Sequence, residues 1–333
     1  MSFKNILGQD RPVSILKNYI GKGTLDGSYL FSGPEGIGKK LVAKTLAKAV
    51  NCIDEGIDSC DVCPSCLKID RNEHPDVFMI DCDTPIFSGS NIVELTDSDA
   101  LKIGHIRQLQ KGISLRPYEG RKKVFIIDAA HKLTVDASNA FLKILEEPVK
   151  NSIIILVTAK PFLLLKTVIS RCRSLKFCAL PRKELKELIK RDYGLDNDTA
   201  HFLAYFSEGK QGCAVSFKDT DLLRHKNTVI DRLALSSKAD FDGIDIKKRQ
   251  DVRGYLNILA AWFRDIYLIK TGIILQEIIN YDRKDELLKQ ANRFSFEELE
   301  AIFDSISDSI FYLERNINTR LLLHNLGAQL WKG

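Results

Sequence analysis

A glycine-rich stretch near the N-terminus has the residue types and spacing of a phosphate-binding loop. It is Gly33-Pro-Glu-Gly-Ile-Gly-Lys39-Lys40, which follows the apolar run 29–32 and precedes a helical pattern over 41–50. In a strand–loop–helix of this kind, backbone N–H groups converge on an anion and the helix N-terminus adds a partial positive charge. The lysine reaches the terminal phosphates. The predicted nucleotide-binding residues of this stretch are Gly33, Gly36, Gly38 and Lys39.

The same stretch departs from the phosphate-loop pattern at its last position. Where G-x-x-x-x-G-K-[ST] has a hydroxyl that ligates Mg²⁺, this chain has Lys40. An ammonium group cannot coordinate a cation. We therefore expect a site that is able to hold a nucleotide but poorly equipped to hydrolyse it.

Two further positions complete the predicted nucleotide site. Asp128 ends the buried-strand pattern 124–128, and in P-loop proteins an acid at the end of such a strand helps to hold the metal. A hydrolytic enzyme of this type normally has Glu next, to polarise the attacking water, whereas this chain has Ala129. Thr158 ends another apolar run, 153–157, near the expected position of a γ-phosphate.

Four cysteines between residues 52 and 66 have metal-ligand spacing. They are Cys52, Cys60, Cys63 and Cys66, half of the eight cysteines in the chain. The two C-x₂-C spacings let neighbouring sulfurs chelate one Zn²⁺ without strain, and a complete Cys₄ shell leaves no open position for a substrate. The sequence therefore predicts a structural zinc knuckle over 52–66, not a catalytic metal centre.

The elements that must position these residues follow from the hydrophobic periodicity. Continuous apolar runs alternate with helical patterns up to about residue 177, which indicates a parallel, doubly wound α/β sheet. From Pro181 onwards the periodicity is helical. We predict a P-loop domain with the zinc module over 1–177, a small helical domain over 178–218 and a helical C-terminal domain over 219–333.

The composition is that of a globular protein. Of the 333 residues, 44% are hydrophobic and 28% are charged, and the formal net charge is +5. The longest apolar runs are too short to span a bilayer, and residues 1–5 lack the features of a secretory signal. We therefore expect a cytoplasmic protein whose cysteines are thiols or metal ligands and not disulfides.

A basic segment over 101–123 leaves two interpretations open. Seven lysines and arginines stand against the single acid Glu119. Apolar residues at helical spacing supply an inward face, so we expect the basic side chains to face solvent. They would form either an ordinary solvated surface or a contact with a nucleic-acid backbone.

Together these motifs resemble those of the bacterial DNA polymerase III clamp-loader subunits, which are AAA+ proteins. The resemblance rests on the P-loop, the zinc knuckle directly after its helix, the strand that ends in Asp128, Leu145-Glu-Glu-Pro148 and Ser170-Arg171-Cys172. It implies an AAA+ P-loop domain, a small helical lid domain and an all-α collar domain that joins subunits in a hetero-pentamer. In this family the arginine of the Ser-Arg-Cys motif projects into the ATP site of the neighbouring subunit, so the resemblance implies that Arg171 acts in trans.

Two subunit types of this family share the plan, the gamma/tau motor and the delta-prime type. The chain departs from the motor at Lys40, at Ala129 and at Gly212, which stands where the motor has a sensor arginine. These departures favour the delta-prime type, a subunit of the polymerase holoenzyme with little or no ATPase activity of its own. The resemblance then implies gamma/tau and delta subunits as partners, with the sliding clamp and primed DNA reached through the complex. It implies Zn²⁺ as a structural ligand and leaves ATP or ADP binding doubtful.

Two other functions stay open at this point. Lys39 and Asp128 would also suit a gamma/tau-like ATPase motor with unusual metal ligation. The Cys₄ cluster would suit a zinc-dependent nucleic-acid-binding protein whose P-loop is a relic, although no base-reading motif accompanies it.

Overall fold

The computed structural model describes residues 1–88, 91–94, 99–147, 149–219, 222–235, 249–273, 275–315 and 317–330. The chain forms two compact units, Met1–Ala179 and Leu180–Gly333. The first unit has hydrophobic cores built on a sheet, and the second has cores built from helices. The finer division of the second unit into 178–218 and 219–333 stays a prediction.

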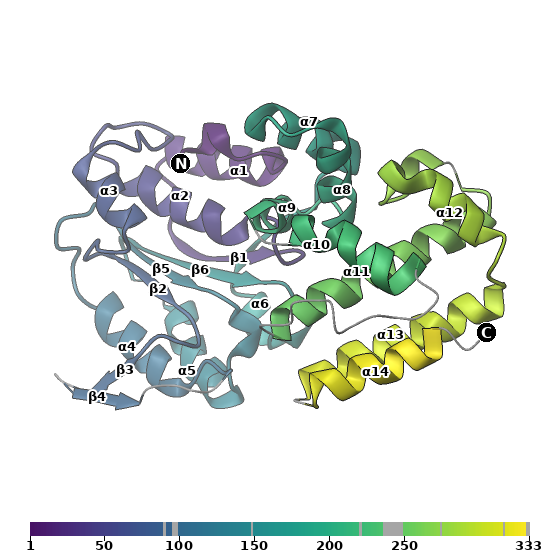
Figure 1. Ribbon diagram of the computed structural model, residues 1–333. Helices are drawn as coiled ribbons and strands as arrows, with labels where there is room; N and C mark the ends of the chain where they lie inside the picture. Colours follow the sequence, from purple (N-terminus) through teal and green to yellow (C-terminus); the bar gives the residue numbers. More distant parts are fainter. Residues whose placement is uncertain are drawn as a thin grey trace. The chain divides into compact units, whose positions relative to one another are not determined.

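A parallel sheet of five strands forms the centre of the first unit. Its strands are β1 (Gly27–Ser32), β2 (Val77–Ile80), β5 (Lys123–Ile127), β6 (Ser152–Thr158) and β7 (Arg173–Lys176), in the order β2-β5-β6-β1-β7. β5 and β6 are buried along their whole length, which is why their sequences are almost wholly apolar. The predicted parallel α/β fold is confirmed (Figure 1).

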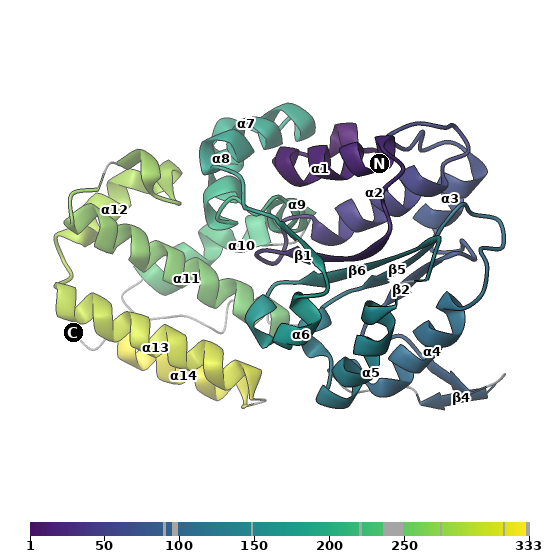
Figure 2. The same ribbon diagram turned by 180° about the vertical axis from the view of Figure 1, so that it is seen from behind.

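Helices cover both faces of this sheet, as Figures 1 and 2 show from opposite sides. On one face lie α1 (Asp10–Gly21) and α2 (Lys39–Asn51), whose Leu16 and Leu46 share a core with Phe31. On the other lie α4 (Ile103–Ile113), α5 (Val135–Glu146) and α6 (Lys166–Ile169), whose core includes Phe141 and Phe125. Because successive strand residues point to opposite faces, the strands β1, β2, β5 and β6 supply both cores, whereas the edge strand β7 supplies only Leu175 to the first.

Shorter elements extend from this framework. The helix α3 (Pro64–Asp70) follows α2, and β3 (Ile86–Ser88) pairs antiparallel with β4 (Asn91–Glu94) in a separate two-stranded sheet. Single 3₁₀ turns over Ala130–Lys132 and Pro161–Leu163 follow β5 and β6. Among the described residues, no helix combines the length and the apolar character that crossing a membrane requires.

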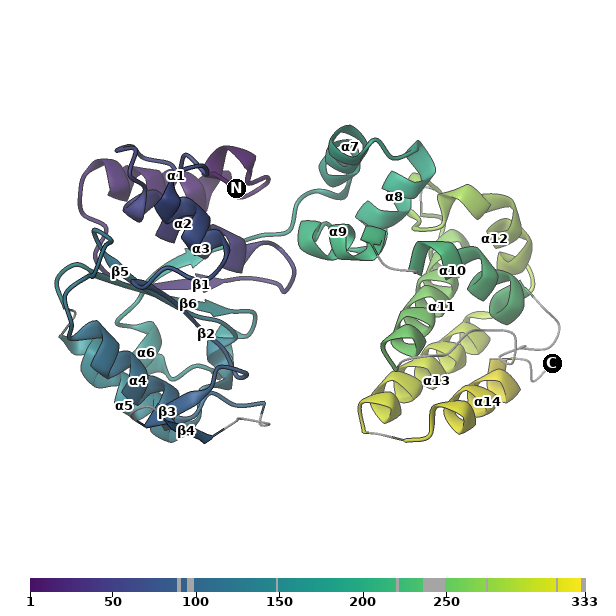
Figure 3. The same ribbon diagram turned by 60° about the vertical axis from the view of Figure 1, so that its left-hand side comes forward.

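The described residues of the second unit are helical or in connecting loops (Figure 3). Its α-helices are α7 (Arg182–Tyr193), α8 (Asn197–Phe206), α9 (Gln211–Asp219), α10 (Leu222–Val229), α11 (Arg249–Lys270), α12 (Lys284–Ala291), α13 (Phe296–Glu314) and α14 (Thr319–Leu330). A π-helical segment, Ile230–Leu235, follows α10.

Buried polar contacts fix α11 inside this unit. The Trp262 indole N–H donates to Gln290 Oε1 at 2.7 Å. The Asp265 carboxylate is fully buried and accepts hydrogen bonds from the backbone N–H groups of Ile279 and Asn280, at 2.9 and 2.8 Å. The Trp262 and Asp265 side chains are therefore part of the interior of the unit, where the indole N–H and the carboxylate oxygens are hydrogen-bonded.

Candidate functional site

The glycine-rich loop joins β1 to α2 in the backbone conformation that its glycines permit. Gly33, Gly36 and Gly38 have φ angles of +152°, +73° and +90°. At Gly33 a Cβ atom would lie 2.3 Å from the Phe177 carbonyl oxygen, so only glycine fits between the loop and the end of β7. The Gly33 N–H also donates to the Thr158 carbonyl at 3.3 Å, which places the loop at the carboxyl end of β6.

Lys39 is folded back onto the loop. Its side chain is buried, and its ammonium group donates to the carbonyl oxygens of Gly33, at 2.7 Å, and of Pro34. Burial lowers the pKa of Lys39. To reach a phosphate, the ammonium group would have to leave both carbonyl oxygens.

Lys40 forms an ion pair with Asp128, the acid that ends the buried strand. Lys40 Nζ lies 2.9 Å from Asp128 Oδ2, and the other carboxylate oxygen accepts the backbone N–H of Ala129 at 2.9 Å. In a hydrolytic P-loop these two positions supply a hydroxyl and a carboxylate on the side of the metal. Here an ammonium group lies against the carboxylate instead, so the residues present do not fit Mg²⁺. The sequence predicted that Lys40 could not be a ligand but not that it would pair with Asp128.

Thr158 is the last residue of β6, beside the loop, and its hydroxyl interacts with other residues of the chain. Its hydroxyl lies 3.1 Å from His131 Nδ1 and accepts the Lys160 backbone N–H at 3.1 Å. Burial lowers the pKa of His131, which favours the neutral ring. The structure thus brings Thr158, Asp128 and the glycine loop to one end of the sheet. We did not predict the contact between His131 and Thr158, because nothing in the local sequence indicates it.

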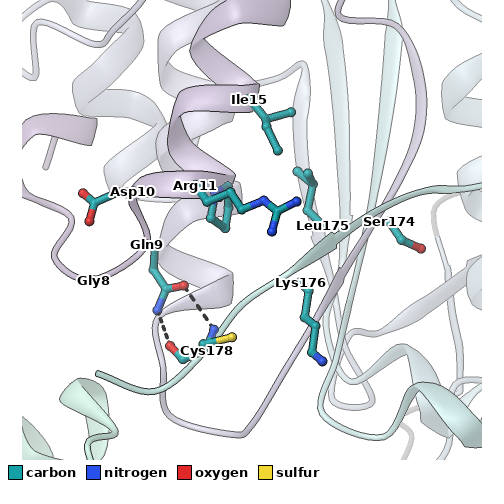
Figure 4. Close-up of a pocket in the computed structure, with 10 residues that line it drawn as sticks. Gly8, Gln9, Asp10, Arg11, Ile15, Ser174, Leu175, Lys176 and Cys178 are labelled. Atoms are coloured by element: carbon teal, nitrogen blue, oxygen red, sulfur yellow. Dashed lines mark hydrogen bonds between the residues drawn. The ribbon is translucent and has the colours of Figure 1, made fainter. Parts of the chain in front are cut away.

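A hollow of about 600 Å³ lies between the start of α1 and the edge strand β7 (Figure 4). Gln9 closes one end of it: its Nε2 donates to the Cys178 carbonyl at 2.7 Å, and its Oε1 accepts the Cys178 N–H at 3.4 Å. The same amide lies 3.5 Å from the Ile37 carbonyl of the glycine loop. Gln9 therefore connects the loop to the end of β7, and Arg11 extends across the hollow toward Leu175.

The four predicted cysteine ligands lie together. The Sγ atoms of Cys52, Cys60, Cys63 and Cys66 are all within 4.8 Å of one another. Burial raises the pKa of the Cys63 thiol, but the backbone N–H of Cys66 and further hydrogen bonds outweigh it and lower this pKa to about 7. A compact set of four sulfurs with N–H groups directed at them suits tetrahedral Zn²⁺, so these residues fit the metal.

The cysteine module is attached to the helix that follows the glycine loop. Lys48, on α2, is buried and pairs with Asp61 at 2.5 Å and with Asp70 at 2.6 Å. Burial lowers the pKa of Lys48, but the bonds to both carboxylates outweigh it and leave this pKa above its ordinary value. On the other side, Arg121 donates to the Cys52 carbonyl at 2.8 Å. The module is thus part of the first unit's framework.

Arg171 follows α6 and lies on the surface. Its Nη2 is 2.8 Å from Glu146 Oε1, and its Nη1 donates to the Thr167 carbonyl at 3.0 Å. The residue precedes the amino end of β7, whose Arg173 pairs with Tyr29 in the first half of β1. Because the strands are parallel and the glycine loop follows the carboxyl end of β1, the Arg171 backbone and the loop lie toward opposite ends of the sheet.

The basic segment 101–123 is less exposed than we predicted. Lys123 is buried and donates to the Gly112 carbonyl at 2.8 Å. Lys122 donates to the Leu25 carbonyl at 2.7 Å and pairs with Asp26. The expectation that all the basic side chains face solvent was therefore wrong, because several of them satisfy carbonyl groups of the fold.

Comparison with known proteins shows which family has these features. Residues 8–181 match the family model described as "DNA polymerase III, delta subunit", and residues 223–330 match the one described as "DNA polymerase III, delta subunit, C terminal". The chain is 36% identical to DNA polymerase III subunit delta' of Bacillus subtilis over 185 residues, which cover 55% of this chain and 52% of that protein. It is 27% identical to subunit tau of the same organism over 317 residues, covering 86% and 54%. The chain thus spans about half the length of these curated relatives.

A solved structure has the same fold. It is a gamma subunit-related protein of DNA polymerase III from Thermotoga maritima, with a TM-score of 0.50 and 19% identity, covering 96% of this chain and 99% of that one.

The cysteine cluster generates a prediction about metal content. We expect about one Zn²⁺ per purified chain by elemental analysis, and its loss in a Cys63→Ser/Cys66→Ser double variant. Losing the metal should lower the melting temperature by about 5–10 °C, because the module no longer supports α2. Cys178→Ser, at an exposed cysteine outside the cluster, should keep both metal and melting temperature. A double variant that retains a full equivalent of zinc would contradict the assignment.

The Lys40–Asp128 pair generates a prediction about magnesium. Binding of a fluorescent ADP analogue, followed by anisotropy, should be no tighter with Mg²⁺ than with EDTA in the wild type. Lys40→Thr removes the ammonium group and restores a hydroxyl, so Mg²⁺ should tighten its binding by about tenfold or more. Lys40→Met removes the charge without supplying a ligand and should show no gain. Binding that Mg²⁺ strengthens in the wild type would show that Lys40 is not the obstacle.

Proposed function

The chain belongs to the DNA polymerase III delta-subunit family, and on that premise we propose that it is a delta-prime-type subunit of a bacterial clamp loader. It braces the assembly without hydrolysing ATP itself and supplies Arg171 to the ATP site of a neighbouring gamma/tau subunit. An arginine supplied in trans places a fixed cation where charge develops during phosphoryl transfer.

One observation carries the proposal for Arg171. Its backbone and the chain's own glycine loop lie toward opposite ends of a parallel sheet. A guanidinium held there is better placed for a nucleotide of another subunit than for one bound to its own.

The proposal that this subunit does not hydrolyse ATP rests on the glycine loop. Lys40 occupies the metal side of Asp128, Ala129 replaces the glutamate that would polarise water, and Lys39 is bound to loop carbonyls. Each feature removes one requirement of P-loop hydrolysis.

The proposed partners follow from the relatives. Proteins similar to this chain are named delta', tau and gamma/tau subunits of DNA polymerase III. We propose a hetero-pentamer with gamma/tau and delta subunits, acting in the cytoplasm, in which the sliding clamp and primed DNA are contacted by the complex as a whole. The helical C-terminal domain over 219–333 would supply the collar contacts, and the zinc module would be structural.

The main alternative is a gamma/tau-like motor with atypical nucleotide motifs. The match to a tau subunit extends over 86% of this chain, more than the match to delta'. That match covers the shared architecture, whereas hydrolysis would depend on the positions of Lys40 and Ala129.

Steady-state ATP hydrolysis with clamp and primed DNA tests the proposal. The chain alone should show no turnover above background. In complexes with the gamma/tau and delta subunits of the same organism, Arg171→Ala should slow hydrolysis at the adjacent site by about 10³-fold or more. The complex then loses the share of turnover that this site contributes. Lys166→Ala, an exposed basic residue of the same segment, is the matched control. Robust turnover by the isolated chain would favour the motor instead.

A further inference from the structure

We propose that Glu146 is a positioning residue that holds the Arg171 side chain in a resting position until the phosphates of a neighbouring subunit's nucleotide displace it. This inference rests on the proposed function, because it assumes that Arg171 acts on another subunit's ATP. Glu146 lies outside the motif Ser170-Arg171-Cys172, and the release of Arg171 from Glu146 is an additional step before Arg171 contacts the nucleotide.

The backbone of Arg171 is fixed, so its side chain is the part that can move. Val168 is fully buried three residues earlier, and the Arg171 N–H donates to its carbonyl at 3.2 Å. On the other side, Cys172 packs against the core beneath α4, α5 and α6, and burial raises the pKa of its thiol to about 12. A buried side chain before Arg171 and a partly buried one after it thus anchor the segment.

At rest the guanidinium is turned back toward its own subunit. Nη1 donates to the carbonyl of Thr167, four residues earlier, and Nη2 contacts Glu146 at the end of α5. A guanidinium has five N–H donors in one plane. An arginine extended into a neighbouring site would have to give up the contact with its own α6 segment, so the observed side chain is not in the extended position.

The position of Glu146 makes the contact favourable for both residues. Glu146 is the last residue of α5, where the helix dipole disfavours a carboxylate. The Arg171 charge offsets that disadvantage. The ion pair with Arg171 therefore stabilises the Glu146 carboxylate when no stronger acceptor is near the guanidinium.

The contact is also weak enough to exchange. The side chains of Arg171 and Glu146 are 36% and 51% exposed, and exposed ion pairs are weak and screened by salt. Nucleotide phosphates carry more charge and can accept two guanidinium N–H groups. Because only the released fraction of Arg171 can contact the nucleotide, holding it at rest weakens the neighbour's apparent affinity for ATP in proportion.

Glu146→Gln tests this without changing shape, because the amide keeps an acceptor oxygen and loses the charge. The assay compares reconstituted complexes carrying the wild type, E146Q, R171A or the E146Q/R171A double variant over a range of ATP concentrations. The quantity of interest is the Arg171-dependent turnover, which is the difference from the matching R171A complex. We expect E146Q to lower its KM by about two- to five-fold, with kcat nearly unchanged. E147Q, at the adjacent exposed glutamate, should leave both constants at wild-type values.

Other results would contradict either the proposed role of Glu146 or the proposed role of Arg171. A fall in kcat for E146Q would mean that Glu146 orients Arg171 for the reaction and does not hold it back. Wild-type constants for E146Q, with R171A impaired, would show that the contact is incidental. If R171A itself has no effect, the proposed function of Arg171 fails, and this result is distinguishable from the failure of Glu146.

Discussion

The ion pair between Lys40 and Asp128 constrains the end of the sheet at which the glycine loop lies. A P-loop enzyme leaves its strand-end acid available to an exchangeable metal ion, which arrives with the nucleotide. Here the cation is covalently part of α2 and is already 2.9 Å from the carboxylate. The acid therefore needs no metal to balance its charge. We therefore expect the binding or loss of a nucleotide to change the electrostatic free energy of this site less than in a P-loop enzyme.

The parallel sheet separates the glycine loop from Arg171, and the proposed function depends on this separation. All five strands run in one direction, so loops that follow strands gather at one end and segments that precede strands gather at the other. The glycine loop follows β1, whereas Arg171 precedes β7. Changes at the first end need not disturb the second. The geometry around Arg171 therefore does not depend on which residues occupy positions 40 and 129.

Features that depend on residues close together in the sequence could be predicted from it. Buried strands such as β6 appear as apolar runs, and the spacing of Cys60, Cys63 and Cys66 is short enough to imply a shared ligand. Contacts between distant segments left no such signal. The partner of Lys40 is 88 residues away, since 128 − 40 = 88, and nothing near Glu146 indicates that it contacts Arg171. Lys123 was predicted to face solvent because apolar residues at helical spacing supply the inward face of that segment, but the Gly112 carbonyl provides Lys123 with a buried acceptor.

Helix α2 is held at both ends by contacts of its lysine side chains. At its N-terminus Lys39 bonds to loop carbonyls and Lys40 bonds to Asp128. Toward its C-terminus Lys48 is buried and pairs with Asp61 of the cysteine module and with Asp70 at the end of α3. A motor would need the first of these regions to change with the state of its nucleotide, whereas a brace benefits when it does not change. A metal ion bound by the four cysteines would also fix the position of Asp61, one of the two carboxylates that contact Lys48 on α2.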